Sequence, residues 1–467
     1  MAATKPCYGR GIASIALRAT HDDSARATPP LLLFAAGLLV RLAFLALEPR
    51  SPLVADETTW TGWGIDNIAS ARVAFSPLRT RMIFHPPLFP YLLGLTWTAF
   101  GSWTAVKVVQ AVAGAALVPA VAMAGAWAGG PRAAVLAGAA AAFYPELIWY
   151  SVHLWSEPLF MALLWWALER TLAADARGGV GRAVGAGVLW GLASLARETA
   201  LYFAPLAALW LAARRPRAPR QGAALLLATV LTVAPWTLRN WIVFRAFIPV
   251  STMGGLNLWQ GNGGLTRDEL YARYKAVHGR IEQYHYAREE GLEAIARRQP
   301  RWLLDKIVNE MPRFWSADSF ALNHIRRGVY GSGEVSPVAA AAAAVLIIGP
   351  HLVVLALFVL GLAWTPFDRA RVLLLTFVVY YTLLHVVTYG YSRFRLPLLP
   401  ALLVIAAQAM VAWRDRARLP AARGRRLMAA AVGVALALAV APSLRHQLAG
   451  AVPEPAEEGG AAQPDVP

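Results

Sequence analysis

Two adjacent carboxylates, Asp56 and Glu57, follow the first long apolar run of the chain, residues 31–47. An aromatic and polar stretch comes next at 60–64, and His85 then opens the segment His-Pro-Pro-Leu-Phe-Pro. Ionisable groups near a bilayer cost free energy unless they are solvated or used in chemistry. A carboxylate here is suited to act as a general base on a substrate that arrives along the membrane. Alternatively, Asp56 and Glu57 are an ordinary solvated pair in a loop and take no part in chemistry.

The composition is that of an integral membrane protein. Of 467 residues, 57% are hydrophobic and only 15% are charged, and the mean hydropathy is +0.46. Soluble domains carry about 25% charged residues. Much of the net charge of +17 lies in short basic clusters at 214–220 and 414–426. Such clusters mark cytoplasmic loops, so we predict membrane lipids and no nucleic acid as partners. The single cysteine, Cys7, excludes a disulfide within the chain.

Apolar segments predict an all-α integral membrane fold with about eleven transmembrane helices. They lie at 30–47, 104–127, 132–150, 158–173, 183–196, 199–213, 222–243, 338–363, 372–390, 397–413 and 427–443. A further run at 88–100 has 13 residues, fewer than the roughly 17–25 that a span needs. We assign it to the membrane interface, because every Arg-rich short loop then becomes cytoplasmic and Asp56 lies outside.

This topology divides the chain into five parts. They are a cytoplasmic tail (1–29), a transmembrane core (30–243) with a large first outer loop (48–103), an extracytoplasmic helical region (244–337), C-terminal transmembrane helices (338–443) and a disordered acidic tail (444–467). In the outer region, one helix is expected over 266–299, ended by Pro300, and a second over 301–315.

The topology also gathers polar residues from distant parts of the chain on the outer face. They are Asp56, Glu57, His85, Glu157, Arg197, Arg239, Asn257, Asn262, Arg393 and Arg395. Arginine binds phosphate through two parallel hydrogen bonds. A carboxylate can deprotonate a hydroxyl as it attacks an anomeric carbon. A lipid phosphate is already a good leaving group, so this set favours sugar transfer from a lipid-phosphate donor without a strong general acid.

Several short motifs occur in an order that resembles a known superfamily. They are Asp56-Glu57, 85–90 (HPPLFP), 144–145 (YP), 156–160 (SEPLF), 191–193 (GLA) with Arg197, 235–240 (PWTLRN), 251–262 (STMGGLNLWQGN) and 393–397 (RFRLP). This order resembles the GT-C superfamily of polyprenyl-phosphate-sugar glycosyltransferases over about residues 30–413. Bacterial members similar to protein O-mannosyltransferases, the lipid A aminoarabinose transferase and rhizobial lipopolysaccharide sugar transferases share the pattern best.

The resemblance implies roles for individual residues. Asp56 matches the acidic residue of the first loop and is the expected base, with Glu57 as its partner. Glu157 matches the acidic position of the second loop, which in some relatives binds a metal or orients the sugar. Here that loop has Ser-Glu-Pro in place of an Asp-x-Asp pair. We therefore assign no metal ligands and no certain cofactor, and the question of a divalent metal stays open.

Three of the other polar residues also have a structural interpretation. His85 could cap the helix that follows it, and Arg197 could form an ion pair with the adjacent Glu198. Arg239, at the end of an apolar segment, could be an anchor that extends to the interface. No motif decides which arginine binds the lipid phosphate.

The expected function is that of a membrane glycosyltransferase of the bacterial inner membrane with its active site on the extracytoplasmic side. It would move a sugar from a polyprenyl-phosphate carrier to a hydroxyl of a glycan, lipid or protein, with inversion at the anomeric carbon. The alternatives are a transporter or lipid-linked sugar flippase and an accessory subunit of an envelope assembly. Transporters usually show repeated halves and broken helices at the midplane, which the sequence does not indicate.

Overall fold

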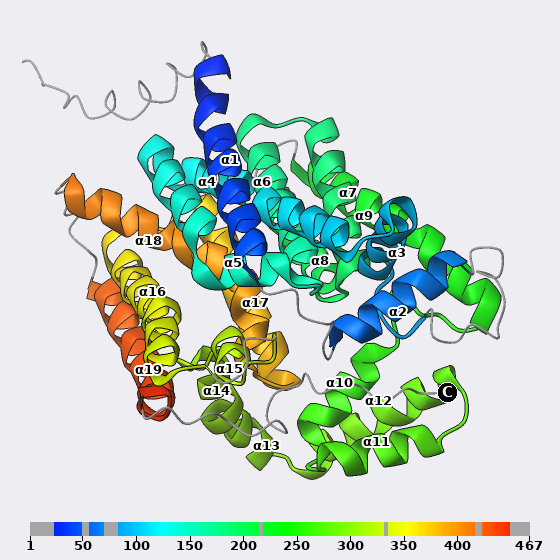
Figure 1. The fold of residues 1–467 in the computed structure, drawn as a ribbon. Helices are drawn as coiled ribbons and strands as arrows, with labels where there is room; N and C mark the ends of the chain where they lie inside the picture. Colours follow the sequence, from blue (N-terminus) through cyan, green and yellow to red (C-terminus); the bar gives the residue numbers. More distant parts are fainter. Residues whose placement is uncertain are drawn as a thin grey trace, which may run out of the picture.

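The computed structural model describes residues 23–48, 56–69, 83–213, 218–330, 335–415 and 423–448. Every regular element in these ranges is a helix, as Figure 1 shows. The predicted all-α class is therefore confirmed. All eleven predicted apolar segments are mainly helical.

Seven of the described helical segments are long and apolar enough to cross a membrane. They are Pro29–Leu47 of α1 (Asp23–Leu47), α4 (Trp103–Phe143), α9 (Ala218–Phe244), α16 (Pro337–Trp364), α17 (Arg369–Val387), Ser392–Arg414, which joins the 3₁₀ helix η4 (Ser392–Leu398) to α18 (Leu399–Arg414), and α19 (Arg423–Leu448). Three shorter helices are also apolar, namely α3 (Leu88–Phe100), α7 (Val180–Ala196) and α8 (Thr199–Ala212). The chain is thus a multi-pass membrane protein, and the number of crossings stays a prediction.

Some element boundaries differ from the predicted ones. The 41-residue helix α4 contains one predicted segment and most of the next, with a kink at Gly130, where φ is 77°. The segment 132–150 is interrupted at Tyr144, because Pro145 begins the short helix α5 (Pro145–Val152). At the termini, α1 begins inside the predicted tail 1–29, and α19 continues beyond residue 443. Residues 1–22 and 449–467 lie outside the described ranges.

A buried arginine joins α1 to α4 and α5. The side chain of Arg41 is 0% exposed, and its Nε donates to Ser151 Oγ at 3.0 Å. Its Nη1 donates to the carbonyl of Ala142 at 3.1 Å. A Cβ added to Gly114 would lie 2.0 Å from Ser151 Oγ, so this junction needs glycine there. The three helices are therefore held together by polar contacts at membrane depth.

Glycines bring α7 and α9 into close contact. A Cβ at Gly187 would lie 2.2 Å from the carbonyl oxygen of Leu225, and one at Gly191 would lie 2.4 Å from Thr232 Cβ. Small residues four apart allow such backbone approach in membrane helices. The close pair fixes the end of α7, where Arg197 is the C-cap residue.

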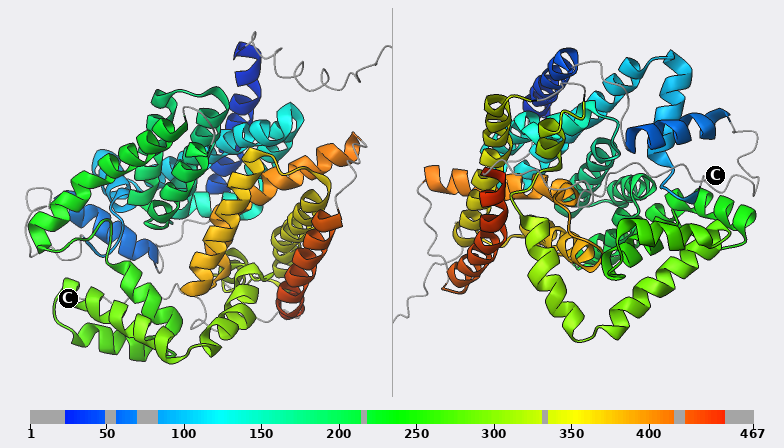
Figure 2. Two further views of the ribbon diagram at one scale, coloured as in Figure 1. Left: turned by 180° about the vertical axis from the view of Figure 1, so that it is seen from behind. Right: turned by 60° about the horizontal axis from the view of Figure 1, so that its bottom comes forward.

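A helical subdomain follows α9. It consists of α10 (Met253–Asn262), α11 (Arg267–Ala276), α12 (Arg280–Arg297), α13 (Arg301–Asp305), the π-helix η3 (Lys306–Glu310), α14 (Met311–Trp315) and α15 (Phe320–Arg326). Its first members lie below the long helices in Figure 1, and Figure 2 (right) shows α12 meeting the 301–315 segment at an angle. The helix predicted over 301–315 is found. The one predicted over 266–299 is two helices, because Gly279 adopts φ 93° between them.

Candidate functional site

Glu157 holds two arginines from distant parts of the chain. The carboxylate is 0% exposed, and its Oε1 accepts from Arg197 Nη2 at 2.7 Å and from Arg393 Nε at 2.5 Å. Arg197 Nε also donates to Ser156 Oγ at 3.1 Å. Burial raises the pKa of Glu157, but the two guanidinium groups outweigh it and keep the pKa below its ordinary value. Glu157 is therefore ionised, and it fixes both arginines side by side.

The local chain explains where these three residues lie. Glu157 is the first residue of α6 (Glu157–Arg177), and Pro158 follows it in the first turn, where a carboxylate is favoured by the helix dipole. Arg197 ends α7 in an extended conformation, and Arg393 lies in η4 just after α17. Each residue thus stands at a helix end, where its side chain is free to turn toward the others.

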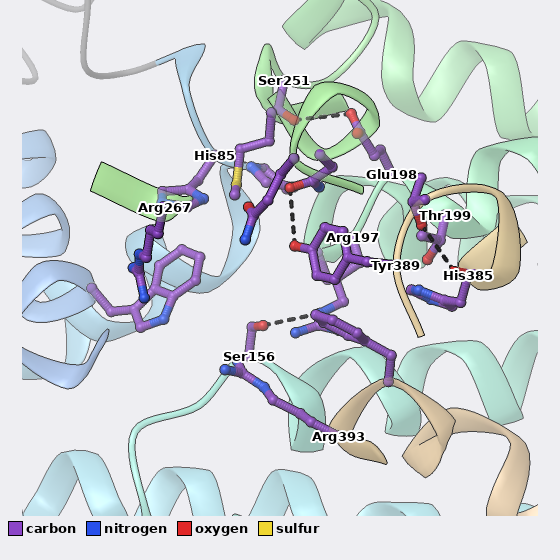
Figure 3. A pocket seen from close by; sticks show the side chains of 18 of the residues that line it. His85, Ser156, Arg197, Glu198, Thr199, Ser251, Arg267, His385, Tyr389 and Arg393 are labelled. Carbon is purple, nitrogen blue, oxygen red and sulfur yellow. Dashed lines mark hydrogen bonds between the residues drawn. The ribbon is translucent and has the colours of Figure 1, made fainter. Parts of the chain in front are cut away.

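These arginines form one wall of a cavity of about 170 Å³ (Figure 3). Four predicted residues line it: His85, Arg197, Asn257 and Arg393. The lining also includes Trp60, Ser156, Glu198, Thr199, Ser251, Arg267, Tyr271, His385 and Tyr389. Pockets for drug-sized ligands usually measure about 300–1,000 Å³. This cavity is therefore suited to a headgroup rather than to a whole lipid-linked molecule.

His85 is an uncharged member of the cavity wall. Its ring lies 4.3 Å from the Trp60 ring and 4.1 Å from the Trp63 ring, measured between centroids. Burial, together with the charges of Arg280 and Arg197, lowers the pKa of His85 well below its ordinary value. A neutral imidazole can donate one hydrogen bond and accept another, but it brings no positive charge to the ligand.

Glu198 also lines the cavity, and in Figure 3 its side chain points toward Ser251. Its Oε2 accepts from Ser251 Oγ at 2.9 Å. Burial raises the pKa of Glu198 to about 7, although the Ser251 hydroxyl lowers it. The interpretation of Arg197 and Glu198 as an ion pair is wrong, because Arg197 turns to Glu157. Glu198 was not among the predicted site residues, and its sequence signal is that of an acidic residue between two short apolar segments.

The acidic pair of the first loop begins helix α2 (Asp56–Ala69). The side chain of Asp56 lies outside what the structure describes. Position 56 precedes Trp60 by one helical turn, so it is on the same face of α2 as a residue that lines the cavity. Glu57 is buried, and its Oε1 accepts from the backbone N–H of Leu154 at 2.8 Å. Glu57 therefore ties α2 to the 153–156 loop.

Besides Glu57 and Glu157, three further predicted residues lie outside the cavity lining. Arg239 stacks on Trp236 and Phe244, with its guanidinium carbon 5.0 and 5.1 Å from the ring centroids. Asn262 donates to the carbonyl of Val387 at 3.0 Å and accepts from Trp302 Nε1 at 2.8 Å, so it joins α10 to α17 and α13.

Arg395, the third of these residues, donates to the carbonyls of Ser316 and Asp318 at 2.5 and 2.6 Å and to that of Phe314. It thus positions the 314–318 segment. Asn257, in contrast, lines the cavity and accepts from the Tyr389 hydroxyl at 3.2 Å. Among the described residues, no three His, Cys, Asp or Glu side chains lie close enough to hold a metal ion together.

Comparison with solved structures shows the fold. No family model and no curated protein sequence matches the chain. The crystal structure of the Archaeoglobus fulgidus oligosaccharyltransferase in the apo form aligns with a TM-score of 0.51 and 15% identity, over 93% of this chain and 57% of that one. The archaeal oligosaccharyltransferase AglB from the same organism, in complex with an inhibitory peptide and a dolichol-phosphate, aligns with a TM-score of 0.50 and 14% identity, over 93% and 56%.

These alignments support the GT-C fold, which the resemblance of the sequence motifs predicts. The chain spans little more than half the length of either archaeal protein.

Proposed function

We propose that this protein is a membrane glycosyltransferase that moves a sugar from a polyprenyl-phosphate carrier to a hydroxyl acceptor. The observation that carries the proposal is the arginine pair, Arg197 and Arg393, held by one oxygen of the buried Glu157 in a headgroup-sized cavity. Two fixed guanidinium groups offer donors to the oxygens of a phosphate. The likeness to archaeal oligosaccharyltransferases, one of them solved with a dolichol-phosphate, supports a lipid-linked donor.

In the proposed reaction, the acceptor hydroxyl gives its proton to the Asp56 carboxylate while its oxygen attacks the anomeric carbon of the donor. The bond between that carbon and the phosphate oxygen breaks, and the phosphate leaves with the bonding electrons. Arg197 and Arg393 stabilise the charge that develops on it. One displacement of this kind inverts the configuration at the anomeric carbon.

The proposal includes a location for the reaction. We assign the cavity and the helical region 244–337 to the extracytoplasmic side of a bacterial inner membrane, because this arrangement places the basic loops at 214–220 and 414–426 in the cytoplasm. The acceptor is a hydroxyl on a glycan, a lipid or a protein. The subdomain next to the cavity is its proposed docking region, because α10 and α11 contribute Asn257, Arg267 and Tyr271 to the lining.

A transfer assay tests the proposal. Membranes containing the protein are supplied with radiolabelled polyprenyl-phosphate sugars and a cell-envelope extract, and Asp56→Asn is compared with the wild type. Asp268→Asn is the matched control, since Asp268 is also in the first turn of a helix and does not line the cavity. We expect label transfer by the wild type and the control and none by Asp56→Asn at equal expression. Equal transfer by both variants removes Asp56 from the chemistry, and no transfer from any donor refutes the enzyme.

A further inference from the structure

Four large apolar side chains in the first part of the segment 301–315 face outward. Leu303, Leu304, Ile307 and Val308 are 53%, 62%, 47% and 66% exposed. They are spaced at one and four residues, which places them on one face of a helix. Four large apolar side chains exposed together on a polar subdomain mark an interaction surface. We define this face by those four residues and name it the apolar face of α13–η3.

The opposite side of the same segment is polar and faces the protein. Lys306 is 4% exposed, and its Nζ donates to the carbonyls of Gly261 and Thr388 at 2.7 and 2.8 Å. Glu310 Oε2 accepts from the backbone N–H of Gly390 at 2.7 Å. A helix packed in water buries its apolar stripe and exposes its polar one. Residues 303–310 show the reverse pattern. This is expected of a helix whose outer face contacts a medium less polar than water.

The hydrogen bond from Lys306 to the carbonyl of Thr388 fixes the depth of this segment relative to the membrane. Thr388 is the C-cap residue of α17, one of the seven helices able to span the membrane. The end of a spanning helix lies at the boundary between hydrocarbon and headgroups. Because Lys306 binds the carbonyl of Thr388, η3 lies at that boundary too. Figure 1 shows α13 and α14 near the lower end of α17.

The charges around the apolar face fit a lipid surface. Residues 298–315 contain four cations and two carboxylates. The side chains of Arg298, Arg301 and Arg313 are 44%, 86% and 49% exposed, and each also lies 3.5–3.7 Å from a carboxylate of the same segment, Asp305 or Glu310. Arginines that flank an apolar stripe extend toward lipid phosphates while the stripe enters the acyl boundary. A net positive charge adds attraction to anionic headgroups.

We infer that the apolar face of α13–η3 is a membrane-contact surface that lies in the lipid interface and anchors helices α10–α12 beside the cavity. Hydrogen bonds of Lys306 connect this membrane-contact surface to the cavity lining. Lys306 binds the carbonyls of Gly261 in α10 and of Thr388, and both α10 and Thr388 contribute to the lining. The occupant is the bilayer itself, and this inference does not depend on the chemistry in the cavity.

Site-directed fluorescence tests this inference. The chain has one cysteine, so Cys7→Ser provides a background in which Val308→Cys or Glu289→Cys is labelled with an environment-sensitive nitrobenzoxadiazole dye. Glu289 is exposed on α12 and serves as the matched control. Each protein is placed in nanodiscs of phosphatidylcholine and phosphatidylglycerol. Quenching is measured with a nitroxide lipid labelled near the acyl carbonyl and with iodide in the water.

We expect position 308 to be quenched by the nitroxide lipid at least threefold more than position 289, and by iodide at least threefold less. Quenching of both positions by iodide alone would overturn the inference. Protection of position 308 from both quenchers would also overturn it, because a protein would then cover the face. Spontaneous disulfide formation between Val308→Cys copies would identify that cover as a second copy of the chain. A gel-filtration profile like that of the background protein shows that each variant is folded.

Discussion

Replacing Glu157 by glutamine tests whether one carboxylate organises the cavity. In the wild type, both Arg197 and Arg393 donate to the same oxygen, Oε1. A neutral amide removes the charge that offsets two adjacent guanidinium groups. Hydrogen bonds to charged groups contribute about 1.5–3 kcal/mol each, and removing one member of a buried ion pair costs about 3–5 kcal/mol. We therefore expect Glu157→Gln to lower stability and to let the two arginines separate.

Separation of the arginines has a calculable effect on donor binding. If one of two charged contacts to the phosphate is lost, binding weakens by about 1.5–3 kcal/mol, which corresponds to a factor of about 10 to 150. The initial rate of sugar transfer, measured against donor concentration, should show this as a higher KM. The acceptor KM should change by less than about threefold, because the reasoning concerns the phosphate alone.

Glu169→Gln is the matched control for this experiment. Glu169 belongs to the same helix, is also 0% exposed and accepts from Trp127 Nε1 at 3.0 Å. Trp127 does not line the cavity, whereas Arg197 and Arg393, the partners of Glu157, do. Its substitution should lower the thermal unfolding midpoint in detergent without changing the donor KM. The reasoning is refuted if Glu157→Gln keeps the wild-type donor KM, or if Glu169→Gln raises that KM to the same extent.

Glu198, Arg395 and Gly261 can each be tested by a single substitution. Burial raises the pKa of Glu198 from 4.5 to about 7, so the folded state holds this proton more tightly than the unfolded state does. The free energy of unfolding therefore falls as pH rises between those values, by up to about 3 kcal/mol. Glu198→Gln should remove this fall, which is measured by comparing unfolding midpoints at pH 4.5 and 8. Arg395→Met leaves two or more buried carbonyls unpaired and should cost about 3 kcal/mol of stability while the donor KM stays within twofold; a large KM change would place Arg395 in the phosphate site. Gly261→Ala would put a Cβ 1.8 Å from the carbonyl oxygen of Thr388, so loss of transfer activity is expected, and wild-type activity would contradict the packing of α10 on α17.

Helix positions were predictable because the bilayer leaves few alternatives. An apolar run long enough to span must satisfy its backbone internally, so run length alone indicates a helix. Breaks inside a run were harder to predict. Tyr144 and Gly279 interrupt predicted segments through local backbone geometry, from Pro145 in one case and a positive φ in the other.

The polar contacts were less predictable than the helices. Placing Glu157, Arg197 and Arg393 on one face followed from topology, but the sharing of a single oxygen depends on packing between α6, α7 and η4. Arg393 and Arg395 share one motif yet have different roles. They lie two residues apart in a 3₁₀ helix with three residues per turn, so their side chains leave the helix in different directions.

The buried Arg41 has a consequence for how the chain is made. A lone arginine near the middle of a spanning helix costs about 2.5–3.5 kcal/mol during insertion. Its partners on the neighbouring helices, Ala142 and Ser151, are synthesised about a hundred residues later. We therefore expect α1 to remain beside the insertion machinery until α5 emerges. Ribosome-bound chains ending before Ala142 should crosslink to the translocon through α1, whereas Arg41→Leu chains should be released into lipid early.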